Sequence, residues 1–197
     1  ILDGMGRPYK SKFARGRCRH TNIINVNLGY DFVTDMLVLE FALDDKLIDT
    51  HRKDNPWLSR AAQSLAEGLR LAASKYLDVE FDELVTGYRL RNNPEGTFVD
   101  IYLYDSLSSG AGYAVSAAEE IGALIKSLEE LLRGCNCESA CYNCLNHYRN
   151  QFIHGMLDRF AALQLLRWGK QGTIAEEFNV EEQKKFIEPL HNILNIS

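Results

Sequence analysis

The chain has 197 residues, of which 46% are hydrophobic and 25% charged, with 14 glycines and 4 prolines. This is the composition of an ordinary globular protein that is long enough to bury a core without disulfides, and it excludes disordered and fibrous classes. The net charge of −5 argues against coating nucleic acid with the whole surface, and no apolar run reaches the roughly 20 residues that a membrane helix needs.

The chain opens with a basic segment. Residues 1–20 hold six Lys and Arg side chains against the single acid Asp3, which gives this arm a charge of +5. Such an arm can bind phosphate although the whole chain is acidic, and a solvated linker explains it equally well. We predict an arm or linker from a larger protein, because the sequence begins with Ile; its candidate nucleic-acid contacts are Arg15, Arg17 and Arg19.

Strands and a long helix are expected next. Residues 21–28 and 34–43 are rich in β-branched and apolar side chains and are predicted to be antiparallel neighbours, with Leu37, Leu39 and Phe41 on a buried face. Asn55-Pro56 marks the start of a helix, in which apolar residues follow at three-and-four spacing as far as Tyr76.

In the second half of the domain the sequence pattern predicts a hairpin followed by helices. Residues 84–90 and 97–104 flank the turn signal Asn-Asn-Pro-Glu-Gly. One helix is expected over 113–133, with an apolar stripe from Val115 to Leu132 and a stop at Gly134. Another helix is expected over 157–168.

These elements predict an α+β fold, a small mostly antiparallel sheet packed with long amphipathic helices. We divide the chain into the basic arm at 1–20, an α+β domain at 21–170 and a helical tail at 171–197. The tail holds one or two acidic amphipathic helices, which a partner subunit could bind.

Four of the five cysteines lie within ten residues, in the sequence CNCESACYNC. Their spacing is Cys-x-Cys-x3-Cys-x2-Cys, at Cys135, Cys137, Cys141 and Cys144. Four thiolates can provide the tetrahedral coordination of a structural Zn²⁺, which leaves no open coordination position for catalysis. We therefore predict a zinc site that joins the end of the long helix to the segment after it.

Three alternatives to a zinc site with four cysteine ligands stay open. A [4Fe–4S] cluster takes the same number of thiolates, and disulfides or a redox relay use the same residues. His147 lies three residues after Cys144 and could replace one thiolate. An odd number of cysteines and the lack of a leader peptide favour reduced thiols in a cytoplasmic protein.

Two further segments are candidates for binding sites. The turn Ser-Ser-Gly-Ala-Gly at 108–112 leads into a helix and could hold an anion, although a tight connection explains it as well and no P-loop or Rossmann spacing is present. Basic and aromatic residues alternate over 146–154, which suits a nucleic-acid surface or a solvated helix face. The candidate contacts there are His147, Tyr148 and Arg149, with Arg159, Arg167 and Lys170 beyond them.

These motifs together resemble a known family. They occur in the order TDML at 34–37, QSLAEGLRLAA at 63–73, Tyr102-Leu-Tyr-Asp105 with Gly110-Ala-Gly112, and then the four cysteines with Leu157-Asp-Arg159 beyond them. This order resembles the C-terminal zinc-binding domain of superfamily 2 DNA helicases related to mitomycin repair factor A, also found in DISARM anti-phage proteins. The resemblance covers roughly residues 20–168. The chain departs from the family at Ser109, where a second glycine is common, and at Ala140-Cys141-Tyr142, where Gly-Cys-Pro is common.

The resemblance implies zinc as the cofactor, with the four cysteines as its ligands. It further implies an accessory domain of an ATP-dependent DNA helicase or translocase in DNA repair or antiviral defence. The ATP-binding motor domains would then lie in the same polypeptide or in a partner subunit, and this chain alone would not be catalytic. The rival expectation is a protein-interaction scaffold that docks a partner through the acidic tail without contacting DNA.

Overall fold

The computed structural model describes residues 29, 31–43, 56–94 and 96–172. The basic arm, the predicted strand at 21–28 and the acidic tail lie outside these residues. All elements described below belong to one compact unit that begins at Val33. Within the described residues no helix is long and apolar enough to span a bilayer.

The sheet is antiparallel, and its described strands have the order β1-β3-β2. Strands β2 (Leu84–Asn93) and β3 (Gly96–Asp105) form the predicted hairpin, while β1 (Met36–Leu43) pairs with the other side of β3. The register of β1 runs from the Met36 and Tyr104 pair to the Leu43 and Thr97 pair. Strand β3 is therefore central, and β1 reaches it from far along the chain.

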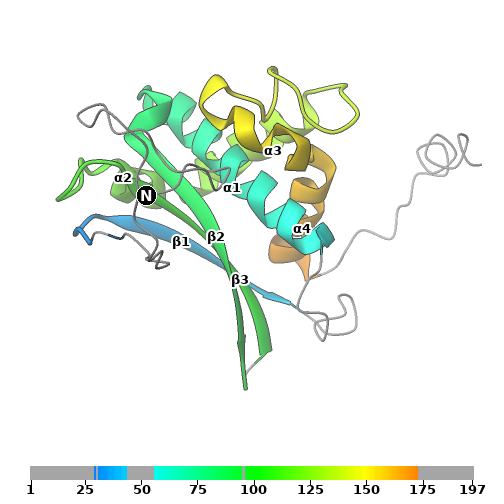
Figure 1. Ribbon diagram of the computed structural model, residues 1–197, viewed down its shortest axis with the longest axis horizontal. Coiled ribbons are helices and arrows are strands. Elements are labelled where there is room, and N and C mark those ends of the chain that lie inside the picture. Colours follow the sequence, from blue (N-terminus) through cyan, green and yellow to red (C-terminus); the bar gives the residue numbers. More distant parts are fainter. Residues whose placement is uncertain (1–28, 30, 44–55, 95, 173–197) are drawn as a thin grey trace, which may run out of the picture. The chain divides into compact units, whose positions relative to one another are not determined.

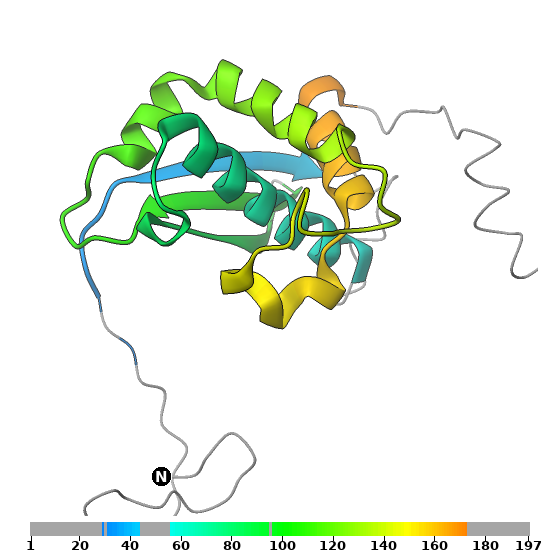
Figure 2. The same ribbon diagram turned by 90° about the horizontal axis from the view of Figure 1, so that it is seen from above.

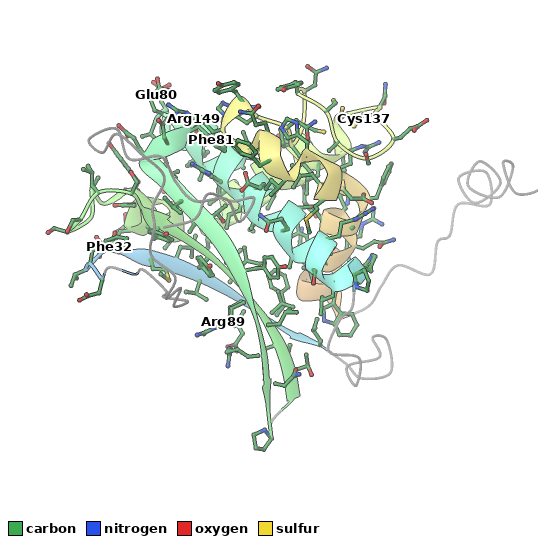
Figure 3. The ribbon with its side chains drawn as sticks, viewed as in Figure 1. Phe32, Glu80, Phe81, Arg89, Cys137 and Arg149 are labelled. Carbon is green, nitrogen blue, oxygen red and sulfur yellow. The ribbon has the colours of Figure 1, made fainter. Side chains whose placement is uncertain are left out.

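The two faces of the sheet differ as the alternation in the sequence predicts. One face is apolar and buried, with Leu37 and Phe41 from β1 and Val99, Ile101 and Leu103 from β3. The helices cover this face, as Figures 1 and 2 show. The opposite face carries polar and aromatic side chains, and Figure 3 shows Arg89 pointing away from the helices on that side. The expected α+β class is confirmed.

Helix α1 (Pro56–Leu77) is the central helix of the layer and matches the predicted one. Its buried side is rich in alanine, which lets it approach both the sheet and other helices closely. Thr86 of β2 donates a hydrogen bond to the carbonyl of Ala66 at 3.2 Å, which ties α1 to the sheet. A 3₁₀ turn, η1 (Phe81–Glu83), links α1 to β2.

The predicted helix over 113–133 is divided in two, so that prediction was wrong. The chain forms α2 (Tyr113–Glu119) and α3 (Ile121–Arg133), separated by Glu120 with non-helical φ −106° and ψ 26°. In α2 the small residues Ala114 and Ala117 face the core, while Val115 is exposed. Small side chains let α2 lie close to the sheet, and the break at Glu120 then returns the leucines of α3 to the core.

The last described elements follow the cysteine loop. A 3₁₀ segment, η2 (Tyr148–Met156), leads to helix α4 (Arg159–Gln171). Asp158 caps α4 by accepting hydrogen bonds from the backbone N–H groups of Phe160 and Ala161. Helix α4 packs along α1, so the chain on both sides of the cysteine loop is anchored to the same core.

Candidate metal centre

The four clustered cysteines converge on one point in the loop between α3 and η2. Their sulfur atoms all lie within 4.8 Å of one another. The Sγ atoms of Cys135 and Cys141 are 3.3 Å apart, and those of Cys137 and Cys144 are 3.6 Å apart. Figure 3 shows Cys137 in this loop, beyond the end of α3.

These distances fit one tetrahedral ion. Four thiolates at roughly 2.3 Å from a common zinc stand about 3.8 Å from each other, which is close to the observed separations. The thiols are free, and 3.3 Å is far beyond the roughly 2.05 Å of a disulfide bond. A [4Fe–4S] cluster binds each thiolate to a different iron, so its sulfurs stand farther apart than ligands that share one ion. The geometry therefore favours zinc over both alternatives.

The loop folds tightly around the second pair of cysteines. The carbonyl of Cys141 accepts hydrogen bonds from the N–H groups of Cys144, Leu145 and Asn146 at 3.0 to 3.2 Å. The N–H group of Cys141 donates to the Cys144 sulfur at 3.2 Å. This turn aims both sulfurs inward without any help from the side chains between them.

The thiols differ in how readily they ionise. Burial raises the pKa of Cys137 to about 12 and also raises the pKa of Cys144. Hydrogen bonds to Cys135, first from the backbone of Cys137 and then from the Cys141 thiol, lower the pKa of Cys135 to about 7. A divalent cation at the centre of the group would stabilise all the thiolates at once.

Arg159 fastens this loop to the helices, a role that the sequence did not reveal. Its side chain is only 7% exposed. Its Nε donates to the carbonyl of Cys137 at 3.0 Å, and its Nη1 donates to the carbonyl of Leu132 at 3.1 Å. The expectation that Arg159 lies on a nucleic-acid surface is wrong, because its guanidinium is buried and donates its hydrogen bonds to backbone carbonyls.

His147 does not belong to the group of converging ligands. Its ring stacks on Phe81 with centroids 4.1 Å apart, and its Nδ1 accepts a hydrogen bond from the N–H group of Arg149 at 3.2 Å. Among the described residues, the only cluster with metal-ligand geometry is made of the four cysteines. His147 therefore caps η2 instead of replacing a thiolate.

The other candidate contacts of η2 lie at the surface. Tyr148 is exposed, and the guanidinium of Arg149 forms an ion pair with Asp82 at 2.8 Å. Figure 3 labels Arg149 in this segment. Arg15, Arg17 and Arg19 lie outside the described residues, so their role stays a prediction.

A buried polar network fixes η2 to α1. The side-chain nitrogen of Asn150 donates to Glu67 and to the carbonyl of Leu145, both at 2.9 Å. Its side-chain oxygen accepts from the N–H group of His147 at 2.7 Å. His154 Nε2 lies 2.9 Å from that oxygen and 3.0 Å from the carbonyl of His147, so it carries a proton to donate. The segment after the cysteines is thus held rigidly although it has little core of its own.

The glycine turn is occupied by a side chain of the protein itself. The buried carboxylate of Asp105 accepts hydrogen bonds from the N–H groups of Ala111 at 2.5 Å, Gly112 at 2.7 Å, Tyr113 at 3.2 Å and Ala114 at 2.8 Å. Gly110 and Gly112 both have positive φ, which lets these groups turn toward one acceptor. The N–H groups that could bind a phosphate are therefore already paired with Asp105, and the turn acts as a structural cap.

Comparison with known proteins agrees with this metal centre. Residues 65–145, which include all four cysteines, match the family described as the MrfA Zn-binding domain. The predicted resemblance is thereby confirmed over these residues, and the cysteine loop lies at the end of the matched segment.

Two longer proteins are similar to the chain. The Druantia protein DruE of Escherichia coli (strain UMEA 4076-1) is 39% identical over 158 residues, which are 76% of this chain and 8% of the relative. A solved structure, the crystal structure of the DUF1998 helicase MrfA bound to DNA, matches with a TM-score of 0.45 and 19% identity over 58% of this chain and 15% of that one. The chain thus spans a small part of the length of both proteins.

Proposed function

We propose that this chain is a zinc-stabilised accessory domain of an ATP-dependent DNA helicase or translocase that acts in DNA repair or anti-phage defence. The observation that carries the proposal is the convergence of four free thiols on one point, inside a segment that matches the MrfA Zn-binding domain family. The motor domains with their ATP-binding motifs would be supplied by the same polypeptide or by a partner subunit.

The zinc has a structural role in this proposal. Four cysteines fill the tetrahedral coordination, so no position stays open for a substrate or a reactive water. A zinc ion bound by the four thiolates would hold the end of α3 against the loop, and Arg159 connects that loop to α4. The ion would therefore stabilise a segment that buries few apolar side chains.

The proposed role of the domain is to contact DNA. The basic arm, through Arg15, Arg17 and Arg19, and the surface of η2, through His147, Tyr148 and Arg149, are its proposed contacts. The net charge of −5 makes such contact local, because a chain that is acidic overall binds phosphates only where its cations cluster.

Metal analysis and DNA binding by the full chain test the proposal. We expect one zinc per chain and binding to DNA that weakens with salt. Changing Arg15, Arg17 and Arg19 to Glu should weaken binding and flatten its dependence on salt. Arg133→Glu is a control, since Arg133 is an exposed cation at the end of α3. Iron in the purified chain, or DNA binding that the triple change leaves intact, would contradict the respective part of the proposal.

A further inference from the structure

Three exposed aromatic rings lie in the cysteine loop and in η2, the segment that follows it. We propose that Tyr142, Tyr148 and Phe152 form a stacking site for the bases of single-stranded DNA, with Arg149 as its contact to phosphate. This inference rests on the proposed engagement of DNA and specifies the form of DNA that the site binds. Stacking on aromatic rings depends little on the base sequence, so the site would distinguish single-stranded from double-stranded DNA without distinguishing the bases.

The exposure of the rings is the first argument. Tyr142 is 70% exposed, Tyr148 69% and Phe152 92%. Single exposed apolar residues are common on protein surfaces, but three aromatic rings between positions 142 and 152 are not scattered. At 92% exposure the ring of Phe152 has little contact with its own protein, so its faces are open to a partner.

The segments that carry the rings are held in place. Tyr142 lies between the ligands Cys141 and Cys144, and its ring meets that of His154 edge-on, with centroids 5.4 Å apart. His154 is bonded in turn to Asn150, which anchors η2 to α1 through Glu67. The metal loop and η2 therefore present their rings from a rigid base, which reduces the ordering that binding costs.

The charge of the segment that carries the rings favours nucleic acid as the partner. Between Ser139 and Leu157 the sequence has no Asp or Glu, although the whole chain has 27. Acidic side chains from another part of the chain do lie beside this segment, because Glu80 and Glu83 line a hollow together with His147. Arg149, whose side chain is 58% exposed, lies between Tyr148 and Phe152 in the sequence. Its ion pair with Asp82 is exposed and therefore weak, so the guanidinium can exchange that carboxylate for a phosphate.

The rings select single strands for a simple reason. In a duplex the bases already stack on one another and turn their faces away from the protein. In a single strand the faces can separate and lie against Tyr or Phe. Duplex DNA would meet only Arg149 and the basic arm, so the two forms of DNA should depend differently on the rings.

Phe152 offers the sharpest test, carried out on the zinc-loaded full chain with a labelled thymidine oligonucleotide and a duplex as probes. Phe152→Leu keeps an apolar side chain but removes the ring, and it should lower the affinity for the single strand by roughly five-fold or more. The affinity for duplex and the zinc content should not change. Phe152→Trp should keep single-strand affinity, and the fluorescence of the new indole should be quenched when a base stacks on it. Leu107→Ala, at an exposed apolar side chain just before the glycine turn, is the matched control and should leave both affinities as they are.

The outcomes separate the two proposals. If the chain binds DNA but Phe152→Leu binds the single strand as tightly as the natural chain, the stacking site is wrong and DNA engagement stands. An equal loss for duplex and single strand also overturns the stacking site. If the natural chain binds neither probe, the proposed function and this inference both fail.

Discussion

Arg159 at the start of α4 donates a hydrogen bond to the carbonyl of Cys137 in the metal loop, at 3.0 Å. A second bond from the same guanidinium reaches the carbonyl of Leu132 at the end of α3. One buried cation thus joins α3, α4 and the loop that carries the thiols. The loop that would hold the metal is therefore also supported by a side chain from outside it.

Replacing Arg159 with Met tests this support. The change keeps much of the buried aliphatic stem but leaves two carbonyls without their donor, so we expect a loss of about 2–3 kcal/mol in the free energy of unfolding. The zinc should also exchange faster with a chelator. Chemical denaturation and chelator competition measure the two effects. Arg133→Met, which removes an exposed guanidinium, should cost less than about 1 kcal/mol.

The thiol ligands allow a direct test of the metal. Cys144→Ser should lower the zinc content below one ion per chain and the Tm by roughly 5 °C or more, because zinc binds only the folded site. Cys18→Ser removes the cysteine outside the cluster and should keep full zinc content. Equal zinc content in the two variants would show that Cys144 is not a ligand.

The parts that the sequence predicted well are those with local causes. The hairpin follows from alternation along β2 and β3, and the thiols follow from four cysteines in ten residues, whose spacing alone brings them together. Nothing in the local sequence indicates the break between α2 and α3, because the apolar spacing continues on both sides of Glu120. Nothing local indicates the role of Arg159 either, since its acceptors lie 22 and 27 residues earlier in the chain.

Asp105 should be among the most sensitive polar residues of the fold. Its carboxylate is fully buried and accepts four backbone hydrogen bonds, so Asp105→Ala leaves those N–H groups unpaired. We expect a loss of about 3 kcal/mol or more. Asp158→Ala removes an ordinary helix cap and should cost about 1 kcal/mol. Thermal and chemical unfolding of the two variants test the ranking, which an equal loss would contradict.

Two glycines should respond to alanine with opposite signs. A Cβ on Gly169 in α4 would lie 2.5 Å from Cδ1 of Phe41, a buried ring of β1 that has no room to move away. Gly169→Ala should therefore cost about 1–3 kcal/mol through overpacking. A Cβ on Gly122 in α3 meets nothing within 4 Å, so Gly122→Ala should add up to about 1 kcal/mol of stability. Unfolding in urea decides both, and destabilisation by both changes would refute the contrast.

Asp100 predicts how the fold responds to acid. Its buried carboxylate accepts hydrogen bonds from Arg91 and Arg89, and these arginines, Arg91 first, lower its pKa below the ordinary 3.8. A carboxyl with a lowered pKa in the folded state binds a proton more readily when unfolded, so its stabilising effect is full above about pH 4. That effect is lost as the pH falls through the lowered folded-state pKa. Asp100→Asn should therefore unfold more easily than the natural chain at neutral pH, and the difference should shrink in acid. Glu40→Gln, at an exposed partner of Arg91, is the control and should change stability little. If the stability difference between Asp100→Asn and the natural chain stays constant from neutral pH to pH 3, the carboxylate charge is not what stabilises this face of the sheet.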